Sequence, residues 1–322
     1  MKILVTGAAG FIGSKLAYQL TQRGDQVIGV DNFNDYYDVR LKQARVKEFG
    51  LDVRHLDIAD KPVVDALFQQ EHFDKVVNLA AQAGVRYSIT NPYAYLQSNL
   101  VGFLNILEAC RNNNVKHLIF ASSSSVYGLN TKVPYSENDK VDNPVSLYAA
   151  TKKSNELMAH AYCNLYGISM TGLRYFTVYG PWGRPDMAPM LFAKAISEGE
   201  PIKVFNNGDM IRDFTYIDDI VEGTIQSIDH EPEPNENGLR YRVYNIGCSN
   251  PVKLMDFISE MEQAMGKSVV KEFLPMQPGD VYQTNADTTK LEAEVGYKPH
   301  VKLHEGIAEF AEWYKSDKNP LK

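Results

Sequence analysis

The amino-terminal 31 residues restrict the fold more than any other part of the chain. Lys2–Thr6 is predicted to be a buried strand, Gly7–Gly13 a turn, Ser14–Arg23 a helix and Gln26–Asp31 a second strand. Two strands joined through a helix must lie parallel, and the crossover between them is almost always right-handed. The chain therefore begins with a strand, helix and strand unit of an α/β protein.

The same alternation continues through the first half of the sequence. We expect three further strands, at Asp52–Asp57, Lys75–Ala80 and His117–Ser122. The helices expected between and after them are Pro62–Gln70, Asn99–Asn112 and Ser146–Tyr166. This order predicts a doubly wound parallel sheet with helices on both faces.

The texture of the sequence changes after Tyr179, where prolines become frequent and short helices and turns are expected through Pro278. A chain of 322 residues exceeds the usual size of one core. We divide it into residues 1–178, a dinucleotide-binding domain, and residues 179–322, a smaller mixed α/β lobe for the substrate. Some segments of the second part are expected to return to the first. Glu231–Gly238 is interpreted as an exposed loop.

Charge and cysteine content argue against several classes of partner. The net charge is −7 and no dense run of Lys or Arg occurs, so we expect no nucleic-acid partner. Cys110, Cys163 and Cys248 have no metal-type spacing, which favours free thiols, a cytoplasmic location and no metal site. The apolar segment Ile3–Gly13 is too short to span a membrane and lacks a cleavage site, so we expect neither a membrane partner nor a signal peptide.

The glycines of TGAAGFIG indicate a site for a dinucleotide. Gly7, Gly10 and Gly13 follow a strand and open a helix, where a tight turn and unpaired N–H groups suit a pyrophosphate. Three glycines alone are also compatible with a simple turn. Asp31, at the end of the second strand, is placed to bind the adenosine ribose and to repel a 2′-phosphate, which favours NAD over NADP. Asp57-Ile58 is a candidate edge of the adenine pocket, although a strand-terminal Asp is often only a cap.

Tyr148 and Lys152 are candidates for proton transfer, because a four-residue spacing on a helix places both side chains on one face. Nearby cations, Lys152 and the nicotinamide ring, are expected to lower the pKa of the phenol, so that Tyr148 can accept a hydroxyl proton while a hydride leaves the same carbon. The spacing alone also arises by chance. Ser122–Ser125 follow a strand, at the sheet edge where doubly wound folds bind ligands, and a hydroxyl there can bond the reacting oxygen.

The spacing Gly-x-x-Gly-x-x-Gly, the Tyr-x-x-x-Lys pair and the serine segment together resemble the extended short-chain dehydrogenase/reductases, and within them the NAD-dependent nucleotide-sugar epimerase/dehydratase family. The resemblance implies a Rossmann-type domain, with Ser123, Tyr148 and Lys152 catalytic and Ser125 in the sugar pocket. It further implies that these residues bind NAD: Gly7, Gly10, Phe11, Ile12, Gly13, Asp31, Asn32, Asp57, Ile58, Leu79, Ala80, Ala81, Asn99, Tyr148, Lys152 and Tyr175.

The resemblance extends to the substrate side of the chain. It implies that Arg212 binds a pyrophosphate, that Val204 and Phe205 pack the uracil, and that Asp280 meets its ribose. A guanidinium suits a pyrophosphate because it donates paired hydrogen bonds, although a surface ion pair would be the simpler interpretation of Arg212. The partner implied is a UDP-sugar.

The segments DNFNDYYDVRLKQARV and AAQAGVRYS are most similar to those of UDP-glucuronate 4-epimerases. Such enzymes must recognise a carboxylate at C5 of the sugar, and the candidates here are Arg86, Ser125, Thr177 and Arg184. Thr177 stands where galactose-type epimerases carry asparagine. Sugar 4,6-dehydratases place an Asp-Glu pair after the catalytic hydroxyl, and UDP-glucuronate decarboxylases typically place a glutamate in the serine segment. Ser122–Gly128 contains neither.

The resemblance therefore implies interconversion of UDP-glucuronate and UDP-galacturonate through a 4-keto intermediate. A UDP-hexose or UDP-N-acetylhexosamine 4-epimerase is the nearest alternative, followed by a decarboxylase. An NAD(H)-sensing regulator without catalysis is the alternative from another class. A homodimer is expected through the broad apolar faces of Asn99–Asn112 and Ser146–Tyr166, because family members commonly pair through helices at these positions.

Overall fold

The structure is a computed structural model that describes residues 1–277 and 279–322, so Pro278, the end of the turn-rich region, lies outside the described residues. A seven-stranded sheet forms its centre, in the order β11, β6, β5, β4, β1, β2, β3, and every pairing in it is parallel. The strands are β1 (Lys2–Thr6), β2 (Gln26–Asp31), β3 (Val53–His55), β4 (Lys75–Asn78), β5 (His117–Ser123), β6 (Ser169–Tyr175) and β11 (Tyr241–Ile246).

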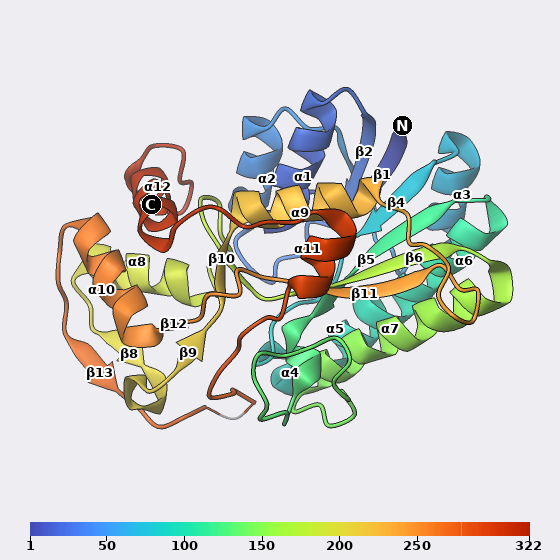
Figure 1. The fold of residues 1–322 in the computed structure, drawn as a ribbon. Helices are drawn as coiled ribbons and strands as arrows, with labels where there is room; N and C mark the ends of the chain where they lie inside the picture. The colour runs from blue at the N-terminus through green and yellow to red at the C-terminus, as the bar shows by residue number, and fades with distance from the viewer. Residues whose placement is uncertain (278) are drawn as a thin grey trace.

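Helices cover both faces of this sheet, as Figure 1 shows. They are α1 (Phe11–Gln22), α2 (Val39–Glu48), α3 (Lys61–Glu71), α6 (Gly102–Asn112), α7 (Leu147–Tyr166), α9 (Ile217–Asp229) and α11 (Thr289–Val295). Two single-turn helices, α4 (Tyr87–Thr90) and α5 (Pro92–Tyr95), pack against α7. The side chains of β1 alternate between two apolar clusters. Ile3 and Val5 face the cluster that contains α1 and α9, whereas Leu4 faces the cluster that contains α3 and α6. The predicted α/β fold with a doubly wound parallel sheet is confirmed.

A smaller lobe lies beside the carboxyl ends of the central strands (Figure 1). It contains α8 (Ala188–Glu198), α10 (Leu254–Met265), α12 (Leu303–Lys315) and the strand pairs β7 (Thr177–Tyr179) with β10 (Phe214–Tyr216), β8 (Ile202–Val204) with β13 (Lys271–Phe273), and β9 (Ile211–Arg212) with β12 (Val252–Lys253). Between these segments the chain returns to the sheet, where β11 pairs with β6. Lobe residues such as Phe257 and Trp313 share one apolar cluster with Ile3 and Val5, so the two parts have a continuous core.

Several predicted boundaries were wrong. The first helix begins at Phe11, not Ser14, because the amide of Gly10 bonds the carbonyl of Gly7 at 2.9 Å and Ser14 N already bonds Gly10 O at 3.1 Å. The helix α2 was not predicted, because its sequence is mostly polar and its buried side includes the charged residues Lys42 and Arg45. The helix expected from Asn99 is a π-helix, η1 (Leu96–Val101), that continues into α6.

The remaining short elements are the 3₁₀ turns η2 (Ser124–Tyr127) and η3 (Phe205–Gly208). Glu231–Gly238 contains neither helix nor strand, as predicted. None of the helices in the described ranges combines the length and hydrophobicity needed to cross a membrane.

Candidate active site

A cavity of about 400 Å³ runs along the carboxyl edge of the sheet, from the glycine turn to the start of α7. It collects most of the sequence-predicted site residues from separate elements. Those that line it are Gly7, Gly10, Phe11, Ile12, Gly13, Asp31, Asn32, Asp57, Ile58, Leu79, Ala80, Ala81, Ser123, Ser125, Tyr148, Lys152, Tyr175, Thr177 and Arg184. Asn99, Arg86, Val204, Phe205, Arg212 and Asp280 do not line this cavity.

The glycine turn is closed so tightly that two of its positions admit no side chain. Gly7 has φ +70°, and a Cβ on Gly13 would lie 2.2 Å from the carbonyl oxygen of Gly7. The turn thus brings the amino end of α1 to the cavity, where its first N–H groups and the helix dipole favour an anion. This cradle suits the pyrophosphate of a dinucleotide.

The carboxylate of Asp31, at the end of β2, lies beside the glycine turn. It accepts the amides of Ala9 at 3.2 Å and Phe33 at 2.8 Å. The ammonium of Lys42, which the sequence analysis did not single out, lies 3.6 Å from Asp31. Asp57 caps a turn through the amide of Ala59 at 2.8 Å and also lines the cavity, so a cap and a place at the cavity are compatible in this residue.

Tyr148 and Lys152 project from the first turns of α7 into the opposite half of the cavity. The helix begins there because Ser146 Oγ accepts the amide of Ala149 at 3.1 Å. Lys152 is only 3% exposed, and its ammonium donates to the carbonyl of Ala121 at 2.9 Å. Burial lowers the pKa of Lys152 to about 8.

The protein groups alone do not produce the lowering of the Tyr148 pKa that is expected beside Lys152 and the nicotinamide ring. Burial raises the pKa of Tyr148, and the hydrogen bond with Ser123 and the charge of Arg184 oppose this effect only in part. A phenol without its proton is costly in an apolar site unless positive charge lies near it. The cation of an oxidised nicotinamide would supply such a charge.

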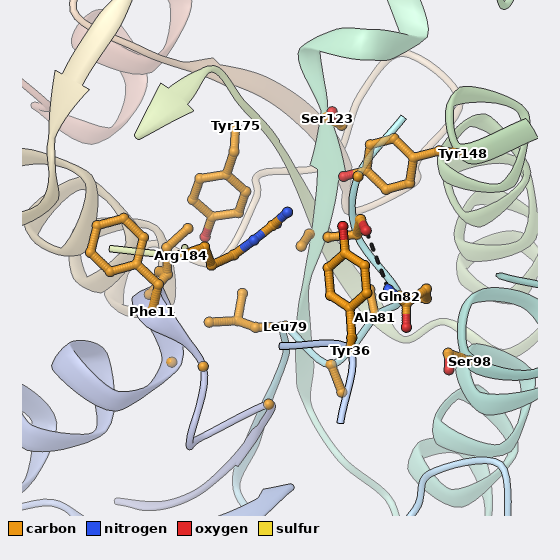
Figure 2. A pocket seen from close by; sticks show the side chains of 18 of the residues that line it. Phe11, Tyr36, Leu79, Ala81, Gln82, Ser98, Ser123, Tyr148, Tyr175 and Arg184 are labelled. Carbon is orange, nitrogen blue, oxygen red and sulfur yellow. Dashed lines mark hydrogen bonds between the residues drawn. The ribbon is translucent and has the colours of Figure 1, made fainter. Parts of the chain in front are cut away.

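Ser123 ends β5 and lies close to Tyr148 in Figure 2. Its Oγ accepts the hydroxyl of Ser125 at 2.9 Å and the amide of Ser125 at 3.2 Å. Both lone pairs of Ser123 are thereby directed, which leaves its own proton free to be donated toward the cavity. Two hydrogen bonds from Ser125 therefore hold the hydroxyl oxygen of Ser123 in place.

A buried ion pair lies behind this segment and was not predicted. Glu156 of α7 accepts Arg174 of β6 at 2.8 and 2.9 Å and the hydroxyl of Ser122 at 2.7 Å. Glu156 is 2% exposed and Arg174 is 3% exposed. The pair therefore fixes the strand that carries Ser123 against the helix that carries Tyr148. Its sequence signal is weak because the two residues are 18 positions apart and belong to different elements.

Arg184 extends its guanidinium toward the hydroxyls of Tyr148 and Tyr36 (Figure 2). It is already paired with Asp186, with Nε 3.0 Å from Oδ1 and Nη2 2.5 Å from Oδ2. Tyr36, from the segment after β2, donates its hydroxyl to the same carboxylate at 3.0 Å. Thr177 of β7 lines the cavity as well. Tyr175 also lines it, and its hydroxyl lies 3.0 Å from Thr224 Oγ1.

Arg45 of α2 is fully buried and connects the glycine turn to the loop that precedes Arg184. Its guanidinium bonds the carbonyl of Ala9 in the glycine turn at 3.0 Å and the carbonyl of Trp182 at 3.1 and 2.7 Å. It also bonds the hydroxyl of Tyr37 at 2.8 Å. Among the described residues no carboxylate lies within ion-pair distance of Arg45. Sequence reasoning missed it, because a charged residue in a polar segment is expected at the surface.

The residues predicted for the nucleotide form a second group outside this cavity, and Arg86, a candidate for the sugar carboxylate, joins them. Arg86 lies 3.5 Å from Asp280 and stacks over the ring of Phe205 at 5.3 Å. Arg212 lies 3.9 Å from Asp280 and donates to the carbonyl of Val281 at 2.7 Å. Val204, next to Phe205, is fully buried. Ion pairs within the protein thus hold both arginines.

Asn99 acts one layer away from the cavity. Its amide donates to the carbonyl of Gln82 at 3.0 Å and to Thr151 Oγ1 at 3.0 Å, while its oxygen accepts the amide of Gln82 at 2.8 Å. It therefore ties the segment after β4, which lines the cavity, to the helix that carries Tyr148 and Lys152.

Comparison with known proteins gives concordant results. UDP-glucuronate 4-epimerase 4 of Arabidopsis thaliana is 48% identical, over 98% of this chain and 75% of the plant protein. UDP-glucuronic acid 4-epimerase of Bacillus cereus, solved with UDP-glucuronic acid and NAD, is 37% identical, with a TM-score of 0.89 over 98% of this chain and 99% of that one. UDP-glucose 4-epimerase of Thermotoga maritima, solved with UDP-glucose, is 31% identical, with a TM-score of 0.87 over 98% and 99% of the two chains.

The model of one protein family matches residues 3–247, a span that begins in β1, ends just beyond β11 and includes the glycine turn, the serine segment and the Tyr148/Lys152 pair. The chain belongs to the NAD dependent epimerase/dehydratase family.

Proposed function

We propose that this protein is an NAD-dependent UDP-glucuronate 4-epimerase, which forms UDP-galacturonate through a transient 4-keto intermediate. The observation that carries the proposal is the convergence of Tyr148, Ser123 and Arg184 at one end of a cavity whose other end is the glycine cradle. The similarity of this chain to UDP-glucuronate 4-epimerases also supports the proposal.

The residues that line the cavity suit each part of an NAD molecule. The glycine turn would hold the pyrophosphate, Asp31 the adenosine ribose, and Lys152 and Tyr175 the nicotinamide half. When bound, NAD supplies a hydride acceptor that later returns the hydride, so no external oxidant is required. The nucleotide would be held by the second group, where Arg212 suits a pyrophosphate and Phe205 and Val204 suit a base.

Tyr148 is assigned the proton chemistry. Its phenolate oxygen would take the O4 proton as the C4–H bond of the sugar breaks, and the resulting phenol would return the proton when the ketone is reduced on its other face. Ser123 donates a hydrogen bond to the same oxygen. The hydrogen bond with Ser123 and the charge of Arg184 oppose the effect of burial on the Tyr148 pKa, and the positive charge of the bound cofactor would add to them.

Arg184 and Thr177 are assigned to the C5 carboxylate, with Ser125 beside them. A 4-keto uronate is a β-keto acid and loses carbon dioxide when its C5–C6 bond aligns with the carbonyl π system. Bonds from Arg184 to the carboxylate would keep that bond out of alignment. Arg86 was a further candidate for the carboxylate, but its contacts with Asp280 and Phe205 favour a place at the nucleotide.

Proton NMR of the purified protein with UDP-glucuronic acid and no added cofactor tests the proposal. We expect the anomeric signal of UDP-galacturonate to grow until equilibrium. No NAD needs to be added, because the purified protein retains its own. An unchanged spectrum, also after addition of NAD, would reject the substrate. The same assay with UDP-glucose and UDP-N-acetylglucosamine separates a neutral-sugar epimerase, and a pentose product would indicate a decarboxylase.

The variant Tyr148→Phe separates an enzyme from an NAD(H)-sensing regulator. In an enzyme this change abolishes turnover while the purified protein retains NAD, because the lost hydroxyl serves proton transfer and not the binding of the pyrophosphate. A regulator would lose nothing measurable in either assay.

We further propose that the protein is a cytoplasmic homodimer. Its three cysteines are free thiols, which suits a reducing compartment. Large apolar side chains are exposed on neighbouring helices, with Leu104 of α6 at 41%, Leu157 of α7 at 60% and Tyr93 of α5 at 75%. Such a surface is typical of one that a second copy covers.

A further inference from the structure

The contacts of Arg184 go beyond the assignment of this residue to a carboxylate, and the inference below rests on the proposed function. Asp186 engages one edge of the guanidinium, the edge formed by Nε and Nη2, with two hydrogen bonds of 3.0 and 2.5 Å. Among the described residues Nη1 has no hydrogen-bond partner. A guanidinium held along one edge still presents a second pair of donors, from Nη1 and Nη2, at its end.

Tyr36 fixes the carboxylate that holds Arg184. Its hydroxyl donates to Asp186 at 3.0 Å, and its ring packs on Tyr87 with 4.7 Å between centroids. Burial and the charge of Asp186 raise the pKa of Tyr36 to about 12, so the hydroxyl stays a donor at working pH. Burial alone would raise the pKa of Asp186, but Arg184 and Tyr36 hold it below its usual range, so the carboxylate stays charged.

The chain leaves space for this cluster at one glycine. Gly84 has φ +101°, and a Cβ there would lie 2.8 Å from the hydroxyl oxygen of Tyr36 and 3.7 Å from Nη2 of Arg184. Tyr95 bonds the carbonyl of Gly84 from the far side and packs edge-on against Tyr148, with 6.0 Å between centroids. The cluster is therefore continuous with the proton-transfer residue.

We propose that Asp186 and Tyr36 are positioning residues that determine substrate specificity, because they lock Arg184 along one edge and direct its free end at the C5 substituent of the sugar. A carboxylate can accept both hydrogens of such an end, whereas a hydroxymethyl group accepts only one and carries no charge. Neither residue touches the reacting atoms. Their effect is confined to the preference for an acidic sugar.

Binding measurements in the Tyr148→Phe background test this, because turnover cannot then complicate the isotherms. Calorimetry compares UDP-glucuronate with UDP-xylose, which lacks the C5 substituent, on the NAD-loaded protein. With Asp186→Asn or Tyr36→Phe added, we expect the affinity for UDP-glucuronate to fall about tenfold or more for Asp186→Asn and less for Tyr36→Phe. The affinity for UDP-xylose should change by less than about twofold, which also shows that each variant is folded.

Tyr244→Phe is the matched control. Tyr244 also donates its hydroxyl to a carboxylate, Glu294, at 2.6 Å, but it does not line the cavity. This variant should leave both affinities unchanged. A general effect of losing a buried tyrosine hydroxyl would appear here as well.

Two results would overturn the inference. Tighter binding of UDP-glucuronate by Asp186→Asn would mean that Asp186 competes with the substrate for Arg184. Equal losses for UDP-glucuronate and UDP-xylose would mean a merely structural role. Failure of the proposed function is read separately, from a Tyr148→Phe protein that binds the two sugars equally and an unaltered protein that does not epimerise UDP-glucuronate.

Discussion

At the scale of single residues, the site separates proton transfer from control of the sugar acid. In the proposed mechanism Tyr148 and Ser123 act on O4, whereas Arg184 and Thr177 hold the C5 carboxylate, and all four residues line one cavity. Both tasks must succeed in the same intermediate, because the ketone that Tyr148 helps to form is the one that can lose carbon dioxide.

The first prediction concerns Arg184→Ala and Thr177→Ala. Each variant removes a group that restrains the carboxylate, so a share of the 4-keto intermediate should break its C5–C6 bond, release carbon dioxide and leave UDP-4-ketopentose. For Arg184→Ala we expect kcat/KM to fall about a hundredfold, as is usual when a charged hydrogen-bonding group is lost. NMR of the product mixture and a bicarbonate assay measure the partition. Variants that slow epimerisation but release no additional UDP-4-ketopentose would contradict the restraining role.

At the scale of elements, the strand β5 has a residue of the cavity, Ser123, at one end and a buried histidine, His117, at the other. Ser123 closes its carboxyl end, and His117 opens its amino end. His117 is fully buried, and its Nε2 lies 2.8 Å from Thr171 Oγ1 of β6. Burial, and then the charge of Lys75, lower the pKa of His117 to about 3.

This depressed pKa gives the second prediction. In the unfolded chain this histidine titrates near pH 6.5. Between about pH 6.5 and about pH 3 the unfolded chain therefore binds a proton at His117 that the folded protein does not bind. The free energy of unfolding must therefore fall as the pH falls through this window, by at most about 1.4 kcal/mol per pH unit from this group.

Urea denaturation at pH 7 and pH 5 measures the effect. His117→Gln keeps a polar group but cannot titrate, so its stability should fall less between the two pH values than that of the unaltered protein, by about 1–2 kcal/mol. His304→Gln is the control, because the His304 side chain is 63% exposed. Parallel losses in all three proteins would show that His117 does not drive the acid response.

The elements also show where sequence reasoning succeeds and where it fails. Strands such as β1 and β5 were predictable because their apolar side chains are buried between two layers of helices. The helix α2 was not, because its buried side is formed by Leu41, Lys42 and Arg45, and polar side chains hide the helical period. The turn chemistry explains the early start of α1, since Gly13 had to lie within the helix to pack against Gly7.

The candidate site divides in the same way. Gly7, Asp31, Tyr148 and Lys152 were predictable, because each follows from local spacing on one strand or helix. Arg45, Asp186 and the Glu156–Arg174 pair were not, because their partners come from distant segments and only the folded chain brings them together. The rise in the Tyr148 pKa that burial causes could not be predicted from the sequence for the same reason, since burial is a property of the whole site.

At the scale of the whole molecule, the exposed apolar surface of α5, α6 and α7 lies on the opposite side of these helices from the core. Leu157 on this surface is 60% exposed. Placing a charge there should cost the monomer little, because the position is already in water, but should oppose burial against a second copy.

The third prediction is that Leu157→Glu yields a monomer at micromolar concentration, whereas the unaltered protein has the mass of a dimer in light scattering. Leu191→Glu on α8, where the parent side chain is 45% exposed, is the matched control and should remain dimeric. A monomeric unaltered protein would refute the dimer itself. A dimeric Leu157→Glu protein would place the contact on another face.

The buried guanidinium of Arg45 bears on how the two halves of the molecule cooperate. One side chain satisfies carbonyls in the turn that cradles the pyrophosphate and in the loop that leads to Arg184. Neither loop can shift without costing the other a hydrogen bond in a site that water does not reach. A ligand that fixes one of these loops would thereby also favour one position of the other, and any such linkage of two binding sites is reciprocal. A sugar nucleotide that is held more tightly by the loaded protein must, by the same factor, raise the equilibrium affinity of the protein for its cofactor.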